Sequence, residues 1–225
     1  MTMTTSNPIA AAVVAAFDHR AALNETMRND RTAALAITTS FAAPLLPTLG
    51  EEVTLCIEGE AATGKTTIAR IAVSPWYPLR PSLSPHLPHS DPSLPMVLDD
   101  TDADGVSEFT GQGRAIIACG ERFLFPGAIV CPPPRGLVSS EISPLIRKCE
   151  AAIGLLGFAW RNALTRVLDH EHVAKTIKGD FQREKEVRGS GVLASLTLTE
   201  HLMHQLLGIG ENHGDICRWA LEKIK

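Results

Sequence analysis

The sequence lacks two features that a membrane protein or a secreted protein would carry. No stretch of its 225 residues approaches the roughly 18–20 consecutive apolar residues that a bilayer-spanning helix needs. No Lys or Arg precedes the Ala- and Val-rich stretch near the N-terminus, whereas a secretory signal peptide begins with positive charge. We therefore expect no membrane partner and a cytoplasmic location.

Paired cysteines are also missing. The five cysteines are widely scattered, and no two of them form a CxxC pair. A chain of this length can build a core without disulfides, so the pattern favours reduced thiols in a cytosolic protein.

The sequence has no strong excess of one charge. Its formal net charge is −4, with 6 Lys and Arg against 13 Asp and Glu in the first 112 residues and 15 against 12 in the remainder. A C-terminal half with a small positive charge could face a polyanion, although a solvated helical surface is the simpler explanation. The 44% apolar and 20% charged residues exclude a wholly disordered chain and indicate one large domain, or one domain with a small appendage.

Two helices are predicted before the first strand. Asn7 and Pro8 are suited to the N-cap and the first helical position, and a helix to about residue 23 would place Ile9, Val13 and Phe17 on one stripe. A second apolar helical pattern runs from residue 31 to about residue 46, where two prolines end it.

The strongest motif is a phosphate-binding loop. The apolar, β-branched segment Glu52–Ile57 is typical of a buried parallel strand, and the helical pattern Thr67–Ala72 follows shortly after it. Between them Gly59–Thr66 matches GxxxxGK[ST] in the order strand, loop, helix that this motif requires.

The motif assigns a role to each part of the loop. Gly59 and Gly64 allow backbone N–H groups to point at phosphate oxygens, and the N-terminus of the following helix adds its dipole. Lys65 would reach the β- and γ-phosphates of ATP, and the Thr66 hydroxyl would bind Mg²⁺. The expected nucleotide-binding residues are Gly59, Glu60, Ala61, Ala62, Thr63, Gly64, Lys65, Thr66 and Thr67.

An acidic partner for the metal is predicted at the end of a second strand. The apolar run Pro95–Leu98 ends in Asp99 and Asp100. Asp99 fits the Mg²⁺ position, through a water molecule, and Asp100 fits the residue that polarises the attacking water. An acidic loop is the alternative, because Asp102 and Asp104 continue the run.

These segments resemble a known family. Residues 34–50, with an Ala-rich helix that ends in Ala-Pro-Leu-Leu, the loop Gly59–Thr67 and the segment Ile71–Trp76 resemble the P-loop ATPase half of the bacterial family named domain of unknown function nine-two-seven. The likeness continues more weakly through Gly111–Ala115 and Pro132–Glu141. Family members occur in plasmids, phages and integrative elements, often beside primase or helicase modules.

The resemblance implies further roles. Ser139 or Ser140, after an expected strand at Gly136–Val138, matches the place of a polar residue that senses the γ-phosphate, and we take Ser140 as the candidate. Arg147 matches arginines that act in cis or on the nucleotide of a neighbouring subunit, and Arg114 is a second candidate. Single- or double-stranded DNA, a second copy of the chain, and a primase or helicase are the implied partners.

The sequence departs from the family between residues 75 and 95. Seven prolines in this stretch forbid a helix or a central strand, so a linker or loop is expected there. The segment from Asp104 to Gly113 is also shorter than the corresponding family connection. Nucleotide binding could survive these changes, whereas efficient hydrolysis is in doubt.

The C-terminal part is predicted to be helical over Ile153–Leu168, Leu193–Leu207 and Cys217–Ile224. The histidines in Asp169–His172 and His201–His204 lack the spacing or the third ligand of a metal site, so a solvated surface is favoured. The mixed charges of Lys175–Arg188 indicate a solvated face, with contact to DNA phosphates as the alternative.

The predicted fold is an α/β P-loop NTPase-type parallel sheet flanked by helices, with a helical C-terminal subdomain. The expected parts are N-terminal helices at residues 1–48, a nucleotide-binding core at 49–150 that the Pro-rich segment 75–95 interrupts, and helices at 151–225.

Three functions remain open. The first is a Mg-ATP-dependent, helicase-like ATPase that acts on DNA in the replication of a mobile element. The second is a nucleotide-binding module with little or no hydrolysis, and the third is a small-molecule kinase, which would use the same loop.

Overall fold

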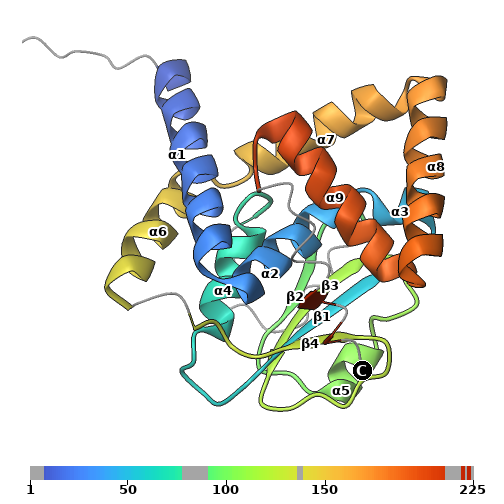
Figure 1. Cartoon of the computed structure of the whole chain (residues 1–225). Helices are drawn as coiled ribbons and strands as arrows, with labels where there is room; N and C mark the ends of the chain where they lie inside the picture. The colour runs from blue at the N-terminus through green and yellow to red at the C-terminus, as the bar shows by residue number, and fades with distance from the viewer. Residues whose placement is uncertain (1–7, 78–90, 136–138, 211–218, 221, 224–225) are drawn as a thin grey trace, which may run out of the picture.

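Four parallel strands form one sheet in the part of the chain that the computed structural model describes, which is residues 8–77, 91–135, 139–210, 219–220 and 222–223 (Figure 1). The strands are β1 (Val53–Glu58), β2 (Met96–Leu98), β3 (Ala115–Gly120) and β4 (Ile129–Cys131). Their order across the sheet is β2-β3-β1-β4. This arrangement confirms the predicted α/β fold with a parallel sheet flanked by helices.

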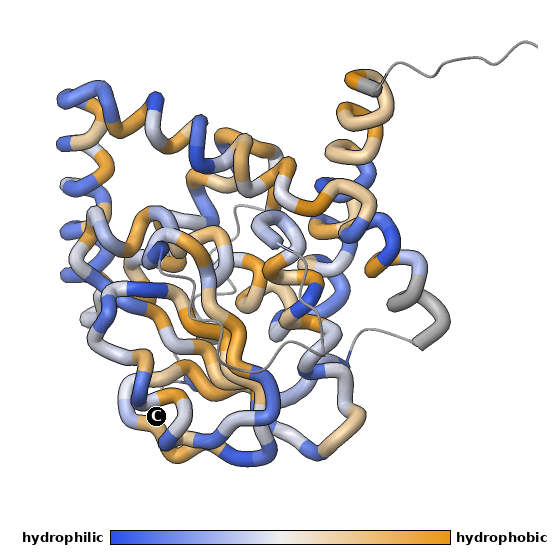
Figure 2. The backbone as a smooth tube through the Cα atoms, turned by 180° about the vertical axis from the view of Figure 1, so that it is seen from behind, coloured by the Kyte–Doolittle hydropathy of each residue, from blue (hydrophilic) through white to orange (hydrophobic). Residues whose placement is uncertain are grey.

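The sheet is buried because helices and loops cover it. Every residue of β3 and β4 is buried, as are the first five residues of β1. Figure 2 shows the strands as the apolar centre of the molecule. Parallel strands that are covered on both faces consist of nearly continuous apolar residues, as these do.

The helices cover more of the sequence than expected in some places and less in others. The first helix extends well beyond the expected end at residue 23, and the second ends at residue 42, just before Pro44. The described helices are α1 (Pro8–Asn29), α2 (Arg31–Ala42), α3 (Leu46–Leu49), α4 (Lys65–Val73), α5 (Ala103–Ser107), α6 (Ser139–Ala151), α7 (Leu155–Leu168), α8 (Glu171–Arg188) and α9 (Gly191–Leu207).

Helix α2 lies at the centre of the packing. All of its residues except Arg31 are buried, and the helix contacts α1, α4, α9 and strand β3. Its many small residues allow close approach from several sides, and Asp30 caps its first turn by accepting a hydrogen bond from the Ala33 N–H at 2.9 Å. One continuous hydrophobic core therefore extends from α1 through the sheet to α9.

Three aromatic residues join the C-terminal helices to this core. The ring of Phe41 in α2 lies 5.8 Å from the ring of Trp76 and 5.8 Å from the ring of Trp160 in α7. The Trp160 indole N–H donates to the Phe41 carbonyl at 2.9 Å, and the Trp76 indole N–H donates to the Ser40 hydroxyl at 2.7 Å. Both indoles therefore combine apolar burial with a satisfied hydrogen bond.

Several expected elements lie outside the described residues. These are residues 78–90 of the Pro-rich segment, the strand expected at 136–138 and half of the helix expected at 217–224. The two ends of the Pro-rich segment are described and lie close together, because the Tyr77 hydroxyl donates to the Pro95 carbonyl at 2.8 Å. None of the described helices has the length and hydropathy to span a membrane.

A buried histidine connects α1 to the end of α4. His19 has no exposed surface, and its Nε2 lies 2.8 Å from the hydroxyl of Ser74. That hydroxyl donates to the Ile71 carbonyl at 2.7 Å, so the Nε2–H of His19 donates to Ser74. Burial lowers the pKa of His19 to about 4, which keeps the ring neutral at physiological pH.

The lowered pKa predicts a loss of stability in mild acid. In the unfolded chain His19 is protonated as the pH falls through 6.5, whereas in the folded chain it stays neutral until about pH 4. His19 therefore lowers the free energy of unfolding between these two pH values, by up to about 3 kcal/mol. Urea unfolding at pH 7.5 and pH 5 should show a smaller acid-induced loss in His19→Gln than in the wild type. The exposed His172 provides the control, since His172→Gln should behave as the wild type.

Candidate functional site

The predicted phosphate loop connects the carboxyl end of β1 to the N-terminus of α4 (Figure 1). Gly64 has a φ of 90° and Ala62 has a φ of 60°, both in the left-handed region. Residues Glu60–Ala62 at the tip of the loop are exposed. A non-glycine residue with this backbone is strained, and such strain is typical of sites where the backbone is shaped for a ligand.

The Lys65 side chain folds back over this loop. Its ammonium group donates to the carbonyl of Gly59 at 2.7 Å and to the carbonyl of Glu60 at 2.6 Å. The side chain is half-buried, so the positive charge is held at the mouth of the loop. A phosphate chain in the loop could replace these two carbonyls as the partner of Lys65.

The residues predicted to hold the metal lie together. The Thr66 hydroxyl donates to the Asp99 carboxylate, with 2.8 Å between the two oxygens, although strand β3 separates the strand before Thr66 from the strand before Asp99. A hydroxyl and a carboxylate are the hard oxygen donors that Mg²⁺ prefers, and Mg²⁺ usually takes its remaining ligands from water and phosphate. The donor set therefore fits a Mg-nucleotide.

Asp100 follows in a strained conformation. Its φ is 53°, and its side chain is exposed at the carboxyl edge of the sheet. The next residue, Thr101, returns to the sheet by donating its backbone N–H to the Cys119 carbonyl at 3.0 Å. The turn thus separates the two carboxylates, with Asp99 toward Thr66 and Asp100 toward solvent.

Strand β3 forms the floor between these two groups, and the sequence reasoning missed it. The apolar run Ala115–Cys119, which Gly120 follows, was the signal that could have identified it. Burial raises the pKa of the Cys119 thiol far above its usual range, with Asp99 adding to the effect and Lys65 opposing it. Cys119 is therefore an inert thiol beneath the candidate site.

The end of β3 contributes two further charged residues that the sequence reasoning did not select. The exposed Glu121 and Arg122 follow the strand directly. The Gly120 carbonyl accepts the Gly59 N–H at 3.1 Å, and the Glu58 carboxylate accepts the Phe123 N–H at 3.0 Å. The β3 end is thus fixed against the start of the phosphate loop.

The other predicted catalytic residues lie elsewhere or are not fully described. Ser140 is in the first turn of α6, and its side chain lies outside the described residues. Arg114 precedes β3 at the opposite edge of the sheet, where it is buried with a guanidinium nitrogen 3.8 Å from the sulfur of Met96.

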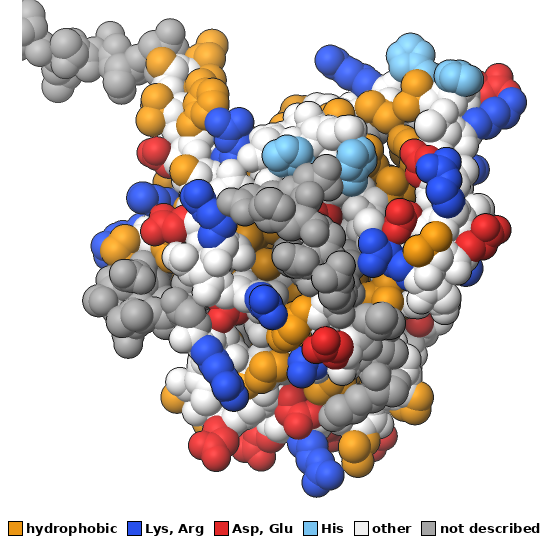
Figure 3. Space-filling view, viewed as in Figure 1, with side chains coloured by type: hydrophobic (Ala, Val, Ile, Leu, Met, Phe, Trp, Pro, Cys, Tyr) orange, Lys and Arg blue, Asp and Glu red, His pale blue; other side chains and the backbone are white. Residues whose placement is uncertain are grey.

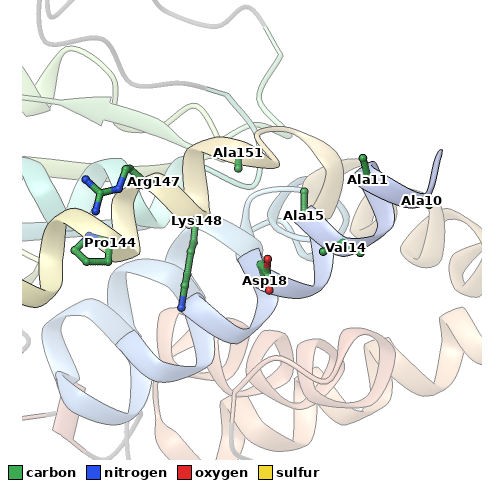
Figure 4. Close-up of a pocket in the computed structure, with 9 residues that line it drawn as sticks. All are labelled: Ala10, Ala11, Val14, Ala15, Asp18, Pro144, Arg147, Lys148 and Ala151. Atoms are coloured by element: carbon green, nitrogen blue, oxygen red, sulfur yellow. The ribbon is translucent and has the colours of Figure 1, made fainter. Parts of the chain in front are cut away.

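Arg147 is exposed on α6 in a groove against α1, as Figure 4 shows. Glu150, one turn further along α6, pairs with Arg70 near the end of α4 that is remote from the phosphate loop. Among the described residues, Arg147 forms no hydrogen bond or ion pair with the phosphate loop. The groove is lined by Ala10, Ala11, Val14, Ala15, Asp18, Pro144, Arg147, Lys148 and Ala151.

Acidic and basic side chains are intermixed along α8, at the right of Figure 3. Lys175, Arg183 and Arg188 each pair with an acidic residue of the same helix, and Lys185 pairs with Glu51 at 2.6 Å. These pairs are typical of a solvated face, in which most of the basic groups are already matched. In the described part of the chain, no three His, Cys, Asp or Glu residues are grouped so that they could hold a metal.

Gly120 has no side chain, and this allows the segment that carries Asp99 and Asp100 to pack closely against β3. A Cβ at this position would lie 2.1 Å from the Thr101 carbonyl oxygen, which is closer than atoms can approach. We expect Gly120→Ala to displace Thr101, together with Asp99 and Asp100, and to lower the free energy of unfolding by about 1–3 kcal/mol. Urea unfolding measures this loss.

A second glycine provides the matched control. Gly179 lies inside α8 with open space around its Cα, so Gly179→Ala should raise the free energy of unfolding by about 0.5–1 kcal/mol. Equal effects of the two substitutions would contradict the close packing at Gly120.

Comparisons with known proteins agree with this fold. A family model described as "Domain of unknown function (DUF927)" matches residues 17–77, a segment that contains α2, β1, the phosphate loop and α4. Among curated proteins, none is significantly similar in sequence. A solved structure described as "SCCmec type IV Cch - active helicase" is similar in fold, with a TM-score of 0.67 and 13% identity over 92% of this chain and 50% of that one. The present chain therefore spans about half the length of that helicase chain.

Proposed function

We propose that the chain binds Mg-ATP at Gly59–Thr67 and hydrolyses it in a helicase-like reaction on DNA. The observation that carries this proposal is the 2.8 Å hydrogen bond between Thr66 and Asp99, because it joins a phosphate loop to a carboxylate from a different strand.

In the proposed mechanism each residue acts on one part of the bound nucleotide. Backbone N–H groups of the loop and the Lys65 ammonium neutralise the phosphate charge that develops during transfer. Thr66 and Asp99 would hold Mg²⁺, which would supply Lewis-acid stabilisation of the phosphate charge. Asp100, exposed beside this pair, would orient the attacking water, and Ser140 would sense the γ-phosphate.

The position of Arg147 favours action between subunits. Arg147 is exposed and has no ion pair among the described residues, which suits an arginine that reaches the nucleotide of a neighbouring copy. An isolated chain would then hydrolyse ATP slowly, and the rate per chain would rise with protein concentration. This also gives a reason for the second candidate function, a nucleotide-binding module that hydrolyses little ATP on its own.

DNA as the partner is supported by the likeness of the fold to a helicase chain and by the family resemblance, which implies replication of a mobile element. The ion pairs along α8 argue against that helix as the main DNA contact. A primase or helicase, or a second copy of this chain, is the further partner that the proposal includes.

The test is phosphate release from Mg-ATP, measured with and without single-stranded DNA over a range of protein concentrations. We expect DNA to stimulate release, and Lys65→Ala to lower it by about 100-fold or more because a charged donor at the phosphates is lost. The exposed Arg166 in α7 provides a control, since Arg166→Ala removes one positive charge far from the loop.

Other outcomes would favour the other functions. ATP consumption that requires an added acceptor would favour a small-molecule kinase. Binding that depends on Lys65 without any turnover would favour a nucleotide-binding module. Turnover that survives Lys65→Ala would contradict the proposed site.

A further inference from the structure

A short proline arm lies beside the phosphate loop on the side away from the metal residues. It consists of Pro132–Arg135, which continues from the carboxyl end of β4. Strand β4 neighbours β1 on one side, whereas β3 and then β2, which leads to Asp99, lie on the other. The arm and Asp99 therefore flank the loop from opposite sides at the same edge of the sheet.

The arm packs directly on the two glycines of the loop. A Cβ on Gly59 would lie 2.9 Å from Cγ of Pro133, and a Cβ on Gly64 would lie 3.3 Å from Cγ of Pro134. Any side chain at residue 59 would thus push against the arm. The two glycines let the loop and the arm approach each other, in addition to shaping the loop itself.

Buried side chains of α2 and its cap hold both ends of the arm. The Thr32 hydroxyl donates to the Pro132 carbonyl at 3.0 Å, and the Asp30 carboxylate accepts the Arg135 backbone N–H at 2.7 Å. Asp30 is buried, and its other oxygen caps α2. Three consecutive prolines also fix the backbone φ angles, so the arm places residue 135 with little loss of conformational entropy.

The residue placed in this way carries a positive charge that the rest of the described chain does not neutralise. Arg135 is exposed, and no acidic side chain of the described residues forms an ion pair with it. An arginine guanidinium is suited to phosphate because its planar donors match the phosphate oxygens. The ordered backbone of the arm therefore holds this arginine at a fixed position beside the phosphate loop.

We propose that Arg135 binds the α-phosphate of the nucleotide. This inference rests on the proposed nucleotide site. Thr66 and Asp99, which would hold the metal and with it the γ-phosphate, lie on the β2 side of the loop. The arm lies on the opposite side, where the nucleoside end of the phosphate chain leaves the loop. Arg135 therefore contributes to the binding of ADP and ATP alike and does not sense the γ-phosphate.

The test compares the dissociation constants of ADP and ATP, each with Mg²⁺, by calorimetry for the wild type and three arginine variants. Arg135→Ala should weaken the binding of ADP and the binding of ATP by a similar factor of about tenfold, because each nucleotide loses one charge-assisted contact. Arg135→Lys should recover part of this loss, since a lysine keeps the charge without the planar donors. Arg28→Ala, which removes another exposed arginine near the start of α2, should change either constant less than twofold.

The outcomes separate this inference from the proposed function. If the wild type binds neither nucleotide, the proposed function fails. If the wild type binds both nucleotides, Lys65→Ala weakens binding and Arg135→Ala changes nothing, only the role of Arg135 is wrong. A loss confined to ATP would place Arg135 at the γ-phosphate and overturn the assignment to the α-phosphate. Circular dichroism of Arg135→Ala should match the wild type, because the residue is exposed.

Discussion

The hydrogen bond between Thr66 and Asp99 is the interaction on which the candidate site depends. It joins two residues that are 33 positions apart in the sequence and that follow β1 and β2, two strands that are not neighbours in the sheet. Strand β3 makes this possible, because it lies between them and is fixed to both, through the Gly59 N–H on one side and the Thr101 N–H on the other. The geometry of the candidate site is thus a property of the strand order, and the loop sequence alone does not produce it.

The same strand order gives the phosphate loop two different flanks. Carboxylates face it from the β2 side, while the proline arm packs on its glycines from the β4 side. Helix α2 supports the arm through Thr32 and Asp30, and Phe41 in the same helix contacts Trp76, which follows α4, and Trp160 within α7. The N-terminal helices are therefore part of the support of the site, and one hydrophobic core connects them to the C-terminal helices.

Local sequence patterns predicted the parts of the fold in which the local signal and the tertiary structure agree. The buried strand before the loop, the loop itself, the short strand before Asp99 and the long C-terminal helices are examples. Strand β3 was missed although its residues are strongly apolar, and the arginines could not be placed because an isolated arginine carries no local signal of its partner. Arg114 and Arg147 were selected by analogy. Arg114 precedes β3 and therefore lies at the amino ends of the strands, whereas Arg147 is exposed on α6 in a groove against α1. Arg135 was overlooked since its significance comes from packing between Pro133, Pro134 and the loop glycines, which are about 70 residues away in the sequence.

The central claim is that this loop and its carboxylate form a Mg-nucleotide site, and a calorimetric titration with ATP tests it most directly. The titration is made in Mg²⁺ and again in excess EDTA, for the wild type, Lys65→Ala and Asp99→Asn. The account predicts that the wild type binds ATP with an affinity that falls in EDTA, that Lys65→Ala binds about 10–100-fold more weakly, and that Asp99→Asn loses most of the dependence on Mg²⁺. Absence of binding by a folded wild-type chain, or equal binding by Lys65→Ala, would contradict it.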